Sequence, residues 1–510
     1  MTIKRSSKES ESNSIASQPS NEEQQDNQNE LFPIVAIGAS AGGLEAFTQL
    51  LSHLPIDSGM AFVLIQHLSP NQKSLLTEIL SRTTKMPVIE VHDGMSVERN
   101  HVYVIPPNTK MIISQGVLKL MPREKSHGIN MTVDAFFFSL AEERRSRAIA
   151  VVLSGGDSDG TRGVETIKAA GGITFAQCED TAKVSSMPNT AVASGYVDFI
   201  LPPQAIAQEL AKISCHPYIK RPTPLKLVEE LLEGEDAIAT IFHQLRDATG
   251  VDFNHYNQTI LRKRILRRMV LYKIERLEDY VRYLQENPEE VSALYQDLLV
   301  ALTCFFRDPK SFEALKSKVF PIIAKARTPE SPIRIWVAGC STGEEAYSIT
   351  ICLLEYLEDQ GIYLPIKIFA TDLNEVAIEK ARIGIYKPSQ LADVSPERLK
   401  RFFVPVEGGY QISKSVRELC IFAKQNLISD PPFSKLDLIT CRNVLTYLGS
   451  HVQKKLLSIF HYSLNSTGFL MLGTSETVSD NNLFTLVGRK YKIYSRKMST
   501  QNNFRLGFTL

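Results

Sequence analysis

The chain has 510 residues, of which 43% are hydrophobic and 22% are charged, and its formal net charge at pH 7 is +1. This composition is ordinary for a globular protein, and the length suggests about three domains. The near-zero net charge excludes a strong overall attraction to nucleic acid or anionic lipid, so any charged partner must be bound by a local surface.

The seven cysteines are odd in number and scattered. No two of them form a C-x-x-C pair, and none lies near histidines at the spacing of zinc ligands, so the sequence predicts no metal site. Scattered free thiols are typical of a reducing compartment. No apolar run approaches the ~20 residues of a membrane-spanning helix, and the N-terminus lacks the apolar core of a signal peptide. We therefore expect a cytoplasmic protein.

The first 30 residues are rich in Ser, Gln, Asn and Glu and almost free of large apolar side chains. Such a segment cannot bury enough apolar surface to offset the entropy that is lost on ordering. We therefore expect residues 1–30 to be disordered.

Residues 31–213 alternate between short apolar runs and amphipathic segments. Six runs have the near-continuous apolar character of strands that are buried on both faces: PIVAIGA, MAFVLIQ, HVYVIPP, AIAVVLSG, GITFAQ and DFILPP. Helical patterns between several of these runs predict a mainly parallel, doubly wound α/β sheet.

A glycine-rich turn follows the first strand, in the segment IVAIGASAGGLEAF. Its residues GASAG match G-x-S-x-G, in which a sharp turn lifts a serine, here Ser40, out of the sheet as a nucleophile. Phosphate-binding loops use the same layout, with backbone N–H groups that hold a phosphate at a helix N-terminus. The phosphate alternative is weaker, because the turn lacks the Lys-Ser/Thr pair of a P-loop and no acidic residue ends the second strand.

A serine nucleophile needs an imidazole base and a carboxylate that orients this base. His67 directly follows the second strand, and the loop LSGGDSDGTRG after a later strand carries Asp157 and Asp159. The carboxyl ends of parallel strands meet at one edge of a sheet, which predicts that these groups lie together. These residues alone do not separate Asp159 from Asp157 as the orienting group.

The motifs AIGASAGG, LIQHLSP, VYVIPPN, VVLSGGDSDGTRG and SSMPNTA resemble the catalytic domain of the chemotaxis protein-glutamate methylesterases (CheB type), over about residues 32–205. The resemblance implies a catalytic triad of Ser40, His67 and Asp159, and so favours Asp159 over Asp157. It implies hydrolysis of protein-glutamate methyl esters, with glutamine deamidation as a further activity.

Two features depart from this family. Gly156 and Asp157 stand where the family usually has methionine and glycine, and the extra carboxylate would raise the pKa of the histidine. The roughly thirty polar residues before the first strand are too few for the family's phospho-receiver domain. We therefore expect no phosphorylation control through such a domain in this chain.

The remaining chain divides into four further segments. Residues 214–226, with several prolines and basic residues, favour a linker. Residues 227–308 have helical periodicity without a strand signal and predict a small all-helical domain. Residues 309–498 contain strand patterns again and predict a second doubly wound α/β domain. The predicted strands are IRIWVAGC, IKIFATDL, LCIFAKQN, LDLITCRN and GFLMLGTS. Residues 499–510 form a short C-terminal tail.

A second glycine turn, VAGCSTGEE, carries Glu344 and Glu345 at the start of the following helix. Acidic residues suit a helix N-terminus, which is an ordinary structural explanation. They would, however, repel a pyrophosphate and attract a ligand with an ammonium and a sulfonium group. Asp372 ends the next strand, where a carboxylate is placed to accept ribose hydroxyls. The turn therefore predicts an S-adenosyl-L-methionine site and disfavours NAD or FAD.

The motifs LTCFFRDPKSF, AGCSTGEEAYS, ATDLNEVAIEKARIGIY, AKQNL, CRNVLTY and GTSE resemble the chemoreceptor glutamate methyltransferases (CheR type), over about residues 230–497. The resemblance implies that S-adenosyl-L-methionine is the cofactor and that Arg307 and Tyr447 lie nearest the transferring methyl group. At Ala301 the family often has asparagine, so one cofactor contact is expected to be missing. The implied cofactor contacts are Thr303, Arg307, Glu344, Asp372, Asn426, Leu427, Arg442 and Asn443.

The segment QTILRKRILRRMVLYKIERL is strongly basic, with five Arg or Lys residues between Arg262 and Arg268. A solvated charged face is the ordinary explanation of such a run. In the methyltransferase family the equivalent helix faces the substrate, a glutamate-rich receptor bundle. We therefore expect this helix to dock an acidic, chemoreceptor-like protein, with membrane contact only through that receptor.

These observations predict two doubly wound α/β domains, an esterase and an S-adenosyl-L-methionine-dependent methyltransferase, joined by a small helical domain. Together they would add and remove methyl esters on receptor glutamates. A non-catalytic or half-active scaffold, and a methyltransferase acting on a small molecule or RNA, are the alternatives. The loop DPPF at 430–433 resembles one of nucleic-acid methyltransferases, but it precedes a strand instead of following one, so no nucleic acid is expected.

Overall fold

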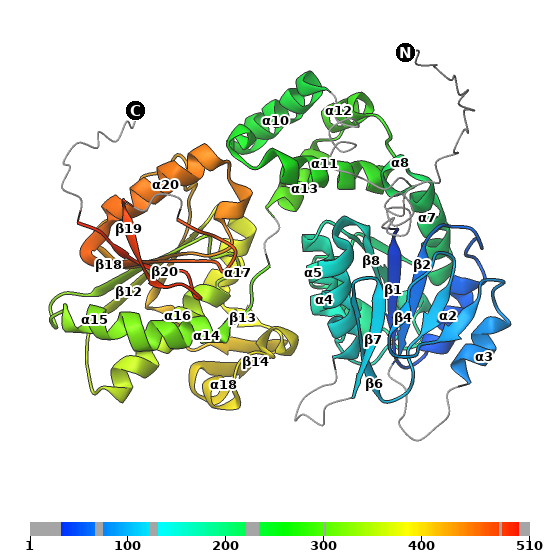
Figure 1. The fold of residues 1–510 in the computed structure, drawn as a ribbon, viewed down its shortest axis with the longest axis horizontal. Helices are drawn as coiled ribbons and strands as arrows, with labels where there is room; N and C mark the ends of the chain where they lie inside the picture. Colours follow the sequence, from blue (N-terminus) through cyan, green and yellow to red (C-terminus); the bar gives the residue numbers. More distant parts are fainter. Residues whose placement is uncertain are drawn as a thin grey trace, which may run out of the picture.

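The computed structural model describes residues 32–66, 75–122, 131–220, 234–299, 302–478 and 482–498. His67, Ala301, the N-terminal segment 1–30 and the tail 499–510 lie outside these residues. Two α/β units stand side by side, and a helical unit lies across one end of both (Figure 1).

The N-terminal unit is built on a seven-stranded sheet in the order β10-β9-β8-β1-β2-β5-β3, in which every pairing is parallel. The six predicted apolar runs form β1, β2, β5, β8, β9 and β10, so their prediction is confirmed. The strands are β1 (Ile34–Ala39), β2 (Ala61–Gln66), β3 (Val88–Glu90), β5 (Val102–Val104), β8 (Ala148–Val152), β9 (Ile173–Gln177) and β10 (Phe199–Leu201).

Helices cover both faces of this sheet, as the continuous burial of β1 and β8 requires. The helices are α2 (Gly43–Leu51), α3 (Leu76–Ser81), α4 (Thr132–Arg144), α5 (Thr161–Ala169), α6 (Ser186–Val192), α7 (Pro203–Cys215) and α8 (Pro217–Lys220). Since α7 and α8 enter the predicted linker, that segment begins as helix. A small antiparallel sheet, which the sequence did not predict, pairs β4 (Met95–Ser96), β7 (Val117–Pro122) and β6 (Thr109–Ser114).

The part of the helical unit that the structure describes is built of α-helices, as its periodicity predicts. They are α10 (Glu235–Thr249), α11 (Gln258–Tyr272), α12 (Leu277–Glu286) and α13 (Pro288–Leu298). The buried apolar side chains of these helices form one continuous core with α2, α7 and α8 of the N-terminal unit. The N-terminal and helical units are therefore packed as one body.

The C-terminal unit has a seven-stranded sheet in the order β16-β12-β11-β17-β18-β20-β19. The five predicted runs form the parallel part, and β19 and β20 add an antiparallel edge. The strands are β11 (Ile333–Ala338), β12 (Ile366–Asp372), β16 (Cys420–Lys424), β17 (Leu436–Cys441), β18 (Leu464–Leu472), β19 (Phe484–Gly488) and β20 (Ile493–Arg496).

Further helices and a three-stranded sheet complete this unit. The helices are α14 (Pro309–Ala314), α15 (Phe320–Lys325), α16 (Glu344–Asp359), α17 (Glu375–Ile383), α18 (Pro396–Phe402), α19 (Lys414–Arg417) and α20 (Ser450–Ser463), and 3-10 turns include η6 (Pro388–Leu391) and η7 (Leu445–Tyr447). The small sheet, also missed from sequence, pairs β13 (Ile385–Tyr386), β15 (Gly409–Ile412) and β14 (Phe403–Val406).

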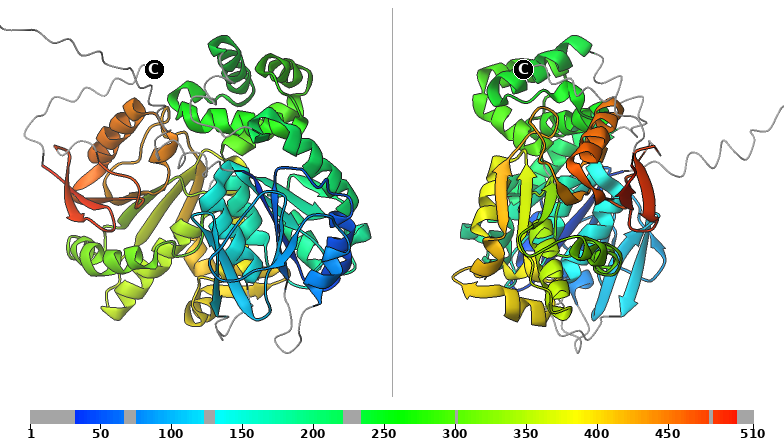
Figure 2. Two further views of the ribbon diagram at one scale, coloured as in Figure 1. Left: turned by 45° about the vertical axis from the view of Figure 1, so that its right-hand side comes forward. Right: turned by 90° about the vertical axis from the view of Figure 1, so that its left-hand side faces the viewer.

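Figures 1 and 2 show that α4 and α5, on one face of the first sheet, are turned toward the C-terminal unit. An ion pair joins the two units directly, with Arg162 of α5 and Asp393 of the C-terminal unit 2.8 Å apart. None of the helices in the described residues is long and apolar enough to cross a membrane.

Candidate functional sites

The Ser40 turn connects β1 to α2 and is held by backbone contacts. The Ser40 N–H donates to the carbonyl of Ser154 at 2.9 Å, and the Ser40 carbonyl accepts from the N–H of Gly43 at 3.0 Å. Gly42, which precedes α2, has a φ of 81°, and a Cβ there would lie 2.6 Å from the hydroxyl of Ser154. Glycine is therefore required at position 42. Ser40 lies half-buried in this turn, at the carboxyl end of the sheet.

Asp159 lies in the loop after β8, the strand that pairs with β1. The side chain is fully buried, and its two carboxylate oxygens accept from the N–H groups of Val133 and Asp134, both at 2.8 Å. These donors belong to the N-terminus of α4, where a negative charge is stabilised. Asp157 instead accepts from the backbone N–H of Asp159 at 3.0 Å and so shapes the loop.

The predicted base, His67, lies outside the described residues. The strand before it, β2, pairs with β1 and ends at Gln66, whose amide nitrogen is 3.4 Å from the carbonyl oxygen of Ser40. The strand order β8-β1-β2 thus brings together the loop of Asp159, the turn of Ser40 and the end of the strand that precedes His67.

Asp134 is a buried acidic neighbour of Asp159 that the sequence did not single out. Its side chain is 1% exposed, and one of its oxygens accepts from the N–H of Gly163 at 2.6 Å. Burial, reinforced by the negative charge of Asp159, raises the pKa of Asp134 to about 8. Asp134 therefore holds a proton at neutral pH.

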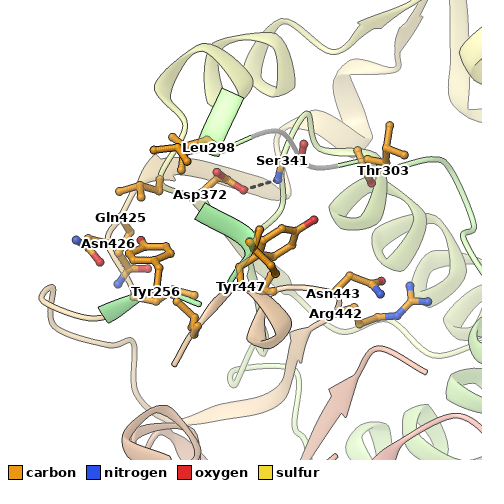
Figure 3. A pocket seen from close by; sticks show the side chains of 18 of the residues that line it. Tyr256, Leu298, Thr303, Ser341, Asp372, Gln425, Asn426, Arg442, Asn443 and Tyr447 are labelled. Atoms are coloured by element: carbon orange, nitrogen blue, oxygen red, sulfur yellow. Dashed lines mark hydrogen bonds between the residues drawn. The ribbon is translucent and has the colours of Figure 1, made fainter. Parts of the chain in front are cut away.

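A second site lies in a cavity of the C-terminal unit, where β11, β12, β16 and β17 end next to one another. Figure 3 shows side chains that reach this cavity from the strand ends and from the helical unit, which contributes Tyr256 and Leu298. Eight of the predicted cofactor and methyl-transfer residues line it: Thr303, Arg307, Asp372, Asn426, Leu427, Arg442, Asn443 and Tyr447.

Asp372 is anchored by the second glycine turn. One carboxylate oxygen accepts from the N–H of Ser341 at 2.8 Å, as Figure 3 shows, and the other accepts from the N–H of Asn374 at 2.8 Å. Burial raises the pKa of Asp372 above its ordinary value, against the opposing effect of these N–H donors. The turn thereby aims an acceptor at the cavity, as the binding of ribose hydroxyls requires.

The two glutamates of this turn are placed differently. Glu345 lines the cavity and accepts from the hydroxyl of Thr440 at 2.8 Å, with Arg442 3.4 Å away. Glu344, the predicted cofactor contact, is 2% exposed, accepts from the hydroxyl of Thr342 and lines a neighbouring cavity instead. Glu345 is thus a cavity residue that the sequence-based choice missed, although it follows Glu344 in the same motif.

Two further residues support the loop after β17. Asn443 has a φ of 61°, and its N–H donates to the buried carboxylate of Glu476 at 2.9 Å. The guanidinium of Arg442 donates to Asp308 at 2.7 Å and to the carbonyl oxygen of Arg307 at 3.0 Å. Glu476 belongs to the GTSE motif, whose role the sequence alone did not indicate.

The donors and acceptors around this cavity fit a nucleoside ligand. Among the described residues, the amide oxygen of Gln425 and the Nε of Arg442 are buried without a hydrogen-bond partner, and both side chains line the cavity. Buried polar atoms of this kind are normally paired, which indicates that a polar ligand belongs here. Leu427 and Ile428 add apolar side chains to the lining of the cavity.

The basic helix α11 differs from the prediction. Arg264, Arg267 and Arg268 are buried, so this part of the helix does not present a basic face for a receptor. Arg267 pairs with Asp198 of the N-terminal unit and with Asp297 of α13, while Arg268 pairs with Glu290. The prediction was wrong for these three arginines, because the N-terminal unit packs against Arg264 and Arg267 and α13 packs against Arg268. Arg262 and Lys263 remain half-exposed.

Three segments of the chain match known protein families. Residues 35–210 match CheB methylesterase, residues 236–299 match the all-alpha domain of CheR methyltransferase, and residues 301–493 match the SAM binding domain of CheR methyltransferase. S-adenosyl-L-methionine is therefore the cofactor of the C-terminal unit.

Relatives of the chain include single proteins that cover one or both parts. An uncharacterized 104.1 kDa protein of Rhodobacter capsulatus is 36% identical over 443 residues, which are 82% of this chain and 46% of that protein. The chain thus spans about half of that relative's length. Chemotaxis protein methyltransferase 2 of Vibrio cholerae is 33% identical over 47% of this chain and 86% of its own length. The solved CheB methylesterase catalytic domain of Thermotoga maritima is 31% identical, over 36% of this chain and 98% of that structure, with a TM-score of 0.33.

Proposed function

Because the chain belongs to the CheB methylesterase family in its N-terminal part and to the CheR methyltransferase family in its C-terminal part, we propose that it both adds and removes methyl esters on glutamate side chains of a chemoreceptor-like protein. The observation that carries the proposal is the placement of two different sets of polar groups at the carboxyl ends of the parallel strands of two separate sheets. Parallel α/β sheets place their sites at this edge.

In the transferase reaction, bound S-adenosyl-L-methionine supplies the electrophilic methyl group. Asp372 and Asn426 would hold the nucleoside of the cofactor, and Glu345 would attract its positively charged groups. Arg307 and Tyr447 orient the acceptor carboxylate toward the cofactor cavity that both of them line. A glutamate carboxylate is already a nucleophile, so alignment and the exclusion of water are what the protein contributes.

In the esterase reaction, the hydroxyl of Ser40 attacks the carbonyl carbon of the methyl ester while His67 takes its proton. The proton passes to the departing methoxide, which leaves as methanol, and a glutamyl ester of Ser40 remains. Water then hydrolyses that ester, with His67 again as the base, and restores the carboxylate. Asp159 orients the imidazole from its position at the N-terminus of α4. With a glutamine side chain, the same sequence releases ammonia and amounts to deamidation.

The test uses the Ser40→Ala protein, which cannot erase its own product. We expect intact-mass spectrometry of a chemoreceptor cytoplasmic fragment, incubated with this variant and S-adenosyl-L-methionine, to show stepwise additions of one methyl group. Adding the wild-type protein is expected to remove them and release methanol. If the variant binds the cofactor but methylates no fragment, and cofactor-dependent label appears on RNA or a small molecule instead, the proposed substrate is wrong.

A further inference from the structure

The surface that the CheR family resemblance predicts for docking is occupied in this chain. Arg264 donates from its guanidinium to the carbonyl oxygens of Lys168, at 2.7 Å, and Ala169, at the end of α5. Arg267 donates to the carbonyl oxygen of Gly172 at 2.8 Å and pairs with Asp198. Substrate must therefore approach the transferase site from another side.

The contact between the N-terminal unit and α11 is too well buried to be a loose association. Asp198 is 3% exposed and lies between Arg267 and Lys168. Burial by itself would raise the pKa of Asp198, but the two cations outweigh burial and lower it. Separating Asp198 from Arg267 and Lys168 would leave buried charges unpaired. It would also divide the apolar core that the N-terminal and helical units share. We therefore expect the N-terminal unit to remain packed against α11.

A second opening leads to the predicted methyl-transfer site. A groove of about 420 Å³ runs between the two α/β units, and Arg307, Asn443 and Tyr447 form its C-terminal wall. These three residues also line the cofactor cavity, so the groove and the cavity meet there. The opposite wall belongs to the N-terminal unit and includes Phe138 of α4 and Thr166 of α5.

We propose that this groove, which we call the inter-unit groove, receives the receptor segment that carries the methyl-accepting glutamate. Helices α4 and α5 of the esterase unit then form half of the transferase's substrate site and determine which segment it accepts. The inference rests on the proposed function. Arg307, where the groove meets the cofactor cavity, gives it a cation that attracts an acidic side chain, while Phe138, Ala169 and Ala170 supply apolar surface for the segment that bears it. Glu142 also lines the esterase wall, so the charge that attracts the acceptor glutamate lies on the transferase side only.

The first test fills the groove without touching the groups that bind the cofactor. Thr166 and Ala170 are half-buried on the esterase wall, and Thr166→Trp and Ala170→Trp place an indole there. Gln208→Trp, at an exposed position of α7, is the matched control and does not line the groove. All three changes are made in the Ser40→Ala protein, and KM and kcat are measured for methylation of a chemoreceptor cytoplasmic fragment.

We expect both groove variants to raise KM at least tenfold, while the cofactor Kd measured by calorimetry stays within twofold and Gln208→Trp behaves as its parent. An unchanged KM in both groove variants, with an active parent, would overturn the inference and leave the proposed function standing. So would a faster reaction, because the esterase unit would then be only a cover. An inactive parent would instead overturn the proposed function.

A second measurement does not depend on a bulky substitution being tolerated. Phe138 is replaced by the photoreactive p-benzoylphenylalanine, which keeps an aromatic ring at this half-buried position of α4. On irradiation we expect a crosslink to the receptor fragment from position 138 and none from position 208. The same photoreactive residue is also placed at the half-exposed position 263 of α11. A crosslink from position 263, with none from position 138, would contradict the inference and indicate that the receptor docks on the basic helix.

Discussion

The turns after β1 and β11 enter their helices in the same way and carry different chemistry. Each runs from a buried strand through a glycine with positive φ into a helix: Gly42 at 81° before α2, and Gly343 at 97° before α16. The first turn exposes the hydroxyl of Ser40, whereas the second brings Glu345 to its cavity and its Ser341 N–H donates to Asp372. The backbone thus makes room for a site, and the residues at the ends of the neighbouring strands decide which chemistry occurs there.

The largest expected effect comes from removing the group that is particular to the first turn. Ser40→Ala is expected to lower the rate of methanol release from a methylated receptor fragment by at least about 10⁴-fold. The rate of methyl transfer should stay within twofold, because the two sites lie on separate sheets. If both activities fell together, the sites would not be independent.

The corresponding change at the second turn is Asp372→Ala. We expect cofactor affinity, measured by calorimetry, to fall by roughly 100-fold, because a charge-assisted hydrogen-bond acceptor is lost. Ester hydrolysis should be unchanged. Asp359→Ala, at an exposed carboxylate at the end of α16, is the control. Equal cofactor affinity in the two variants would argue against the ribose-binding role of Asp372.

Both turns have a glycine with positive φ before the helix, and each glycine can be replaced by alanine. A Cβ at Gly42 would lie 2.6 Å from the hydroxyl of Ser154, and one at Gly343 would lie 2.9 Å from the Cβ of Ala381. Gly42→Ala and Gly343→Ala should each lower the free energy of unfolding by about 1–3 kcal/mol. The control is Gly94→Ala, at an exposed glycine with a φ of 83° and no atom within 4 Å of the added Cβ. In chemical denaturation we expect it to lower the free energy of unfolding by less than the other two changes do.

These glycine variants should also separate the two activities. Gly42→Ala is expected to impair hydrolysis and spare cofactor binding, and Gly343→Ala is expected to do the reverse. The same loss of both activities in each variant would indicate a global effect on folding and not a local displacement of the site.

The smallest expected effect concerns the carboxylates near the two turns. Asp134 and Asp159, near the first turn, are buried next to each other, whereas Glu345 and Asp372, near the second, line a cavity. The pKa of Asp134 is about 8 in the folded protein and roughly 3.9 in the unfolded chain. Between these values the folded state holds a proton that the unfolded state has released, so the free energy of unfolding decreases as pH rises.

The isosteric Asp134→Asn variant has no such proton and keeps the oxygen that accepts from Gly163. We expect the stability of this variant relative to wild type to increase as the pH rises from 5 to 8, as measured by denaturant unfolding. A constant difference across this range would mean that Asp134 is ionised when folded. Cofactor affinity should not follow this pH dependence, since Asp134 belongs to the other unit.

Local sequence patterns were sufficient to predict the parallel strands of both main sheets except the short edge strand β3. The strands of each parallel core are short, continuous apolar runs, and such runs need no partner in order to be recognised. The small sheet β4-β7-β6 and the edge strands β19 and β20 were missed, because half-exposed antiparallel strands carry a weaker signal. The sequence analysis chose Glu344 as a cofactor contact, whereas Glu345 lines the cavity. Adjacent residues at the start of a helix point in different directions, and the motif does not indicate which of them faces the ligand.

The sequence by itself determined the two families, the cofactor, the parallel cores and the strand ends at which Ser40, Asp159 and Asp372 stand, because each depends on short-range patterns and on the rule that parallel strands end together. Only the tertiary structure decided that Arg264, Arg267 and Arg268 are buried, that Asp134 keeps a proton, and that α4 and α5 face the transferase site across a groove. These features arise from contacts between residues that lie far apart in the chain, such as Arg264 with Lys168 and Arg162 with Asp393. Burial sets the cost of every charge, and it exists only once those contacts have formed.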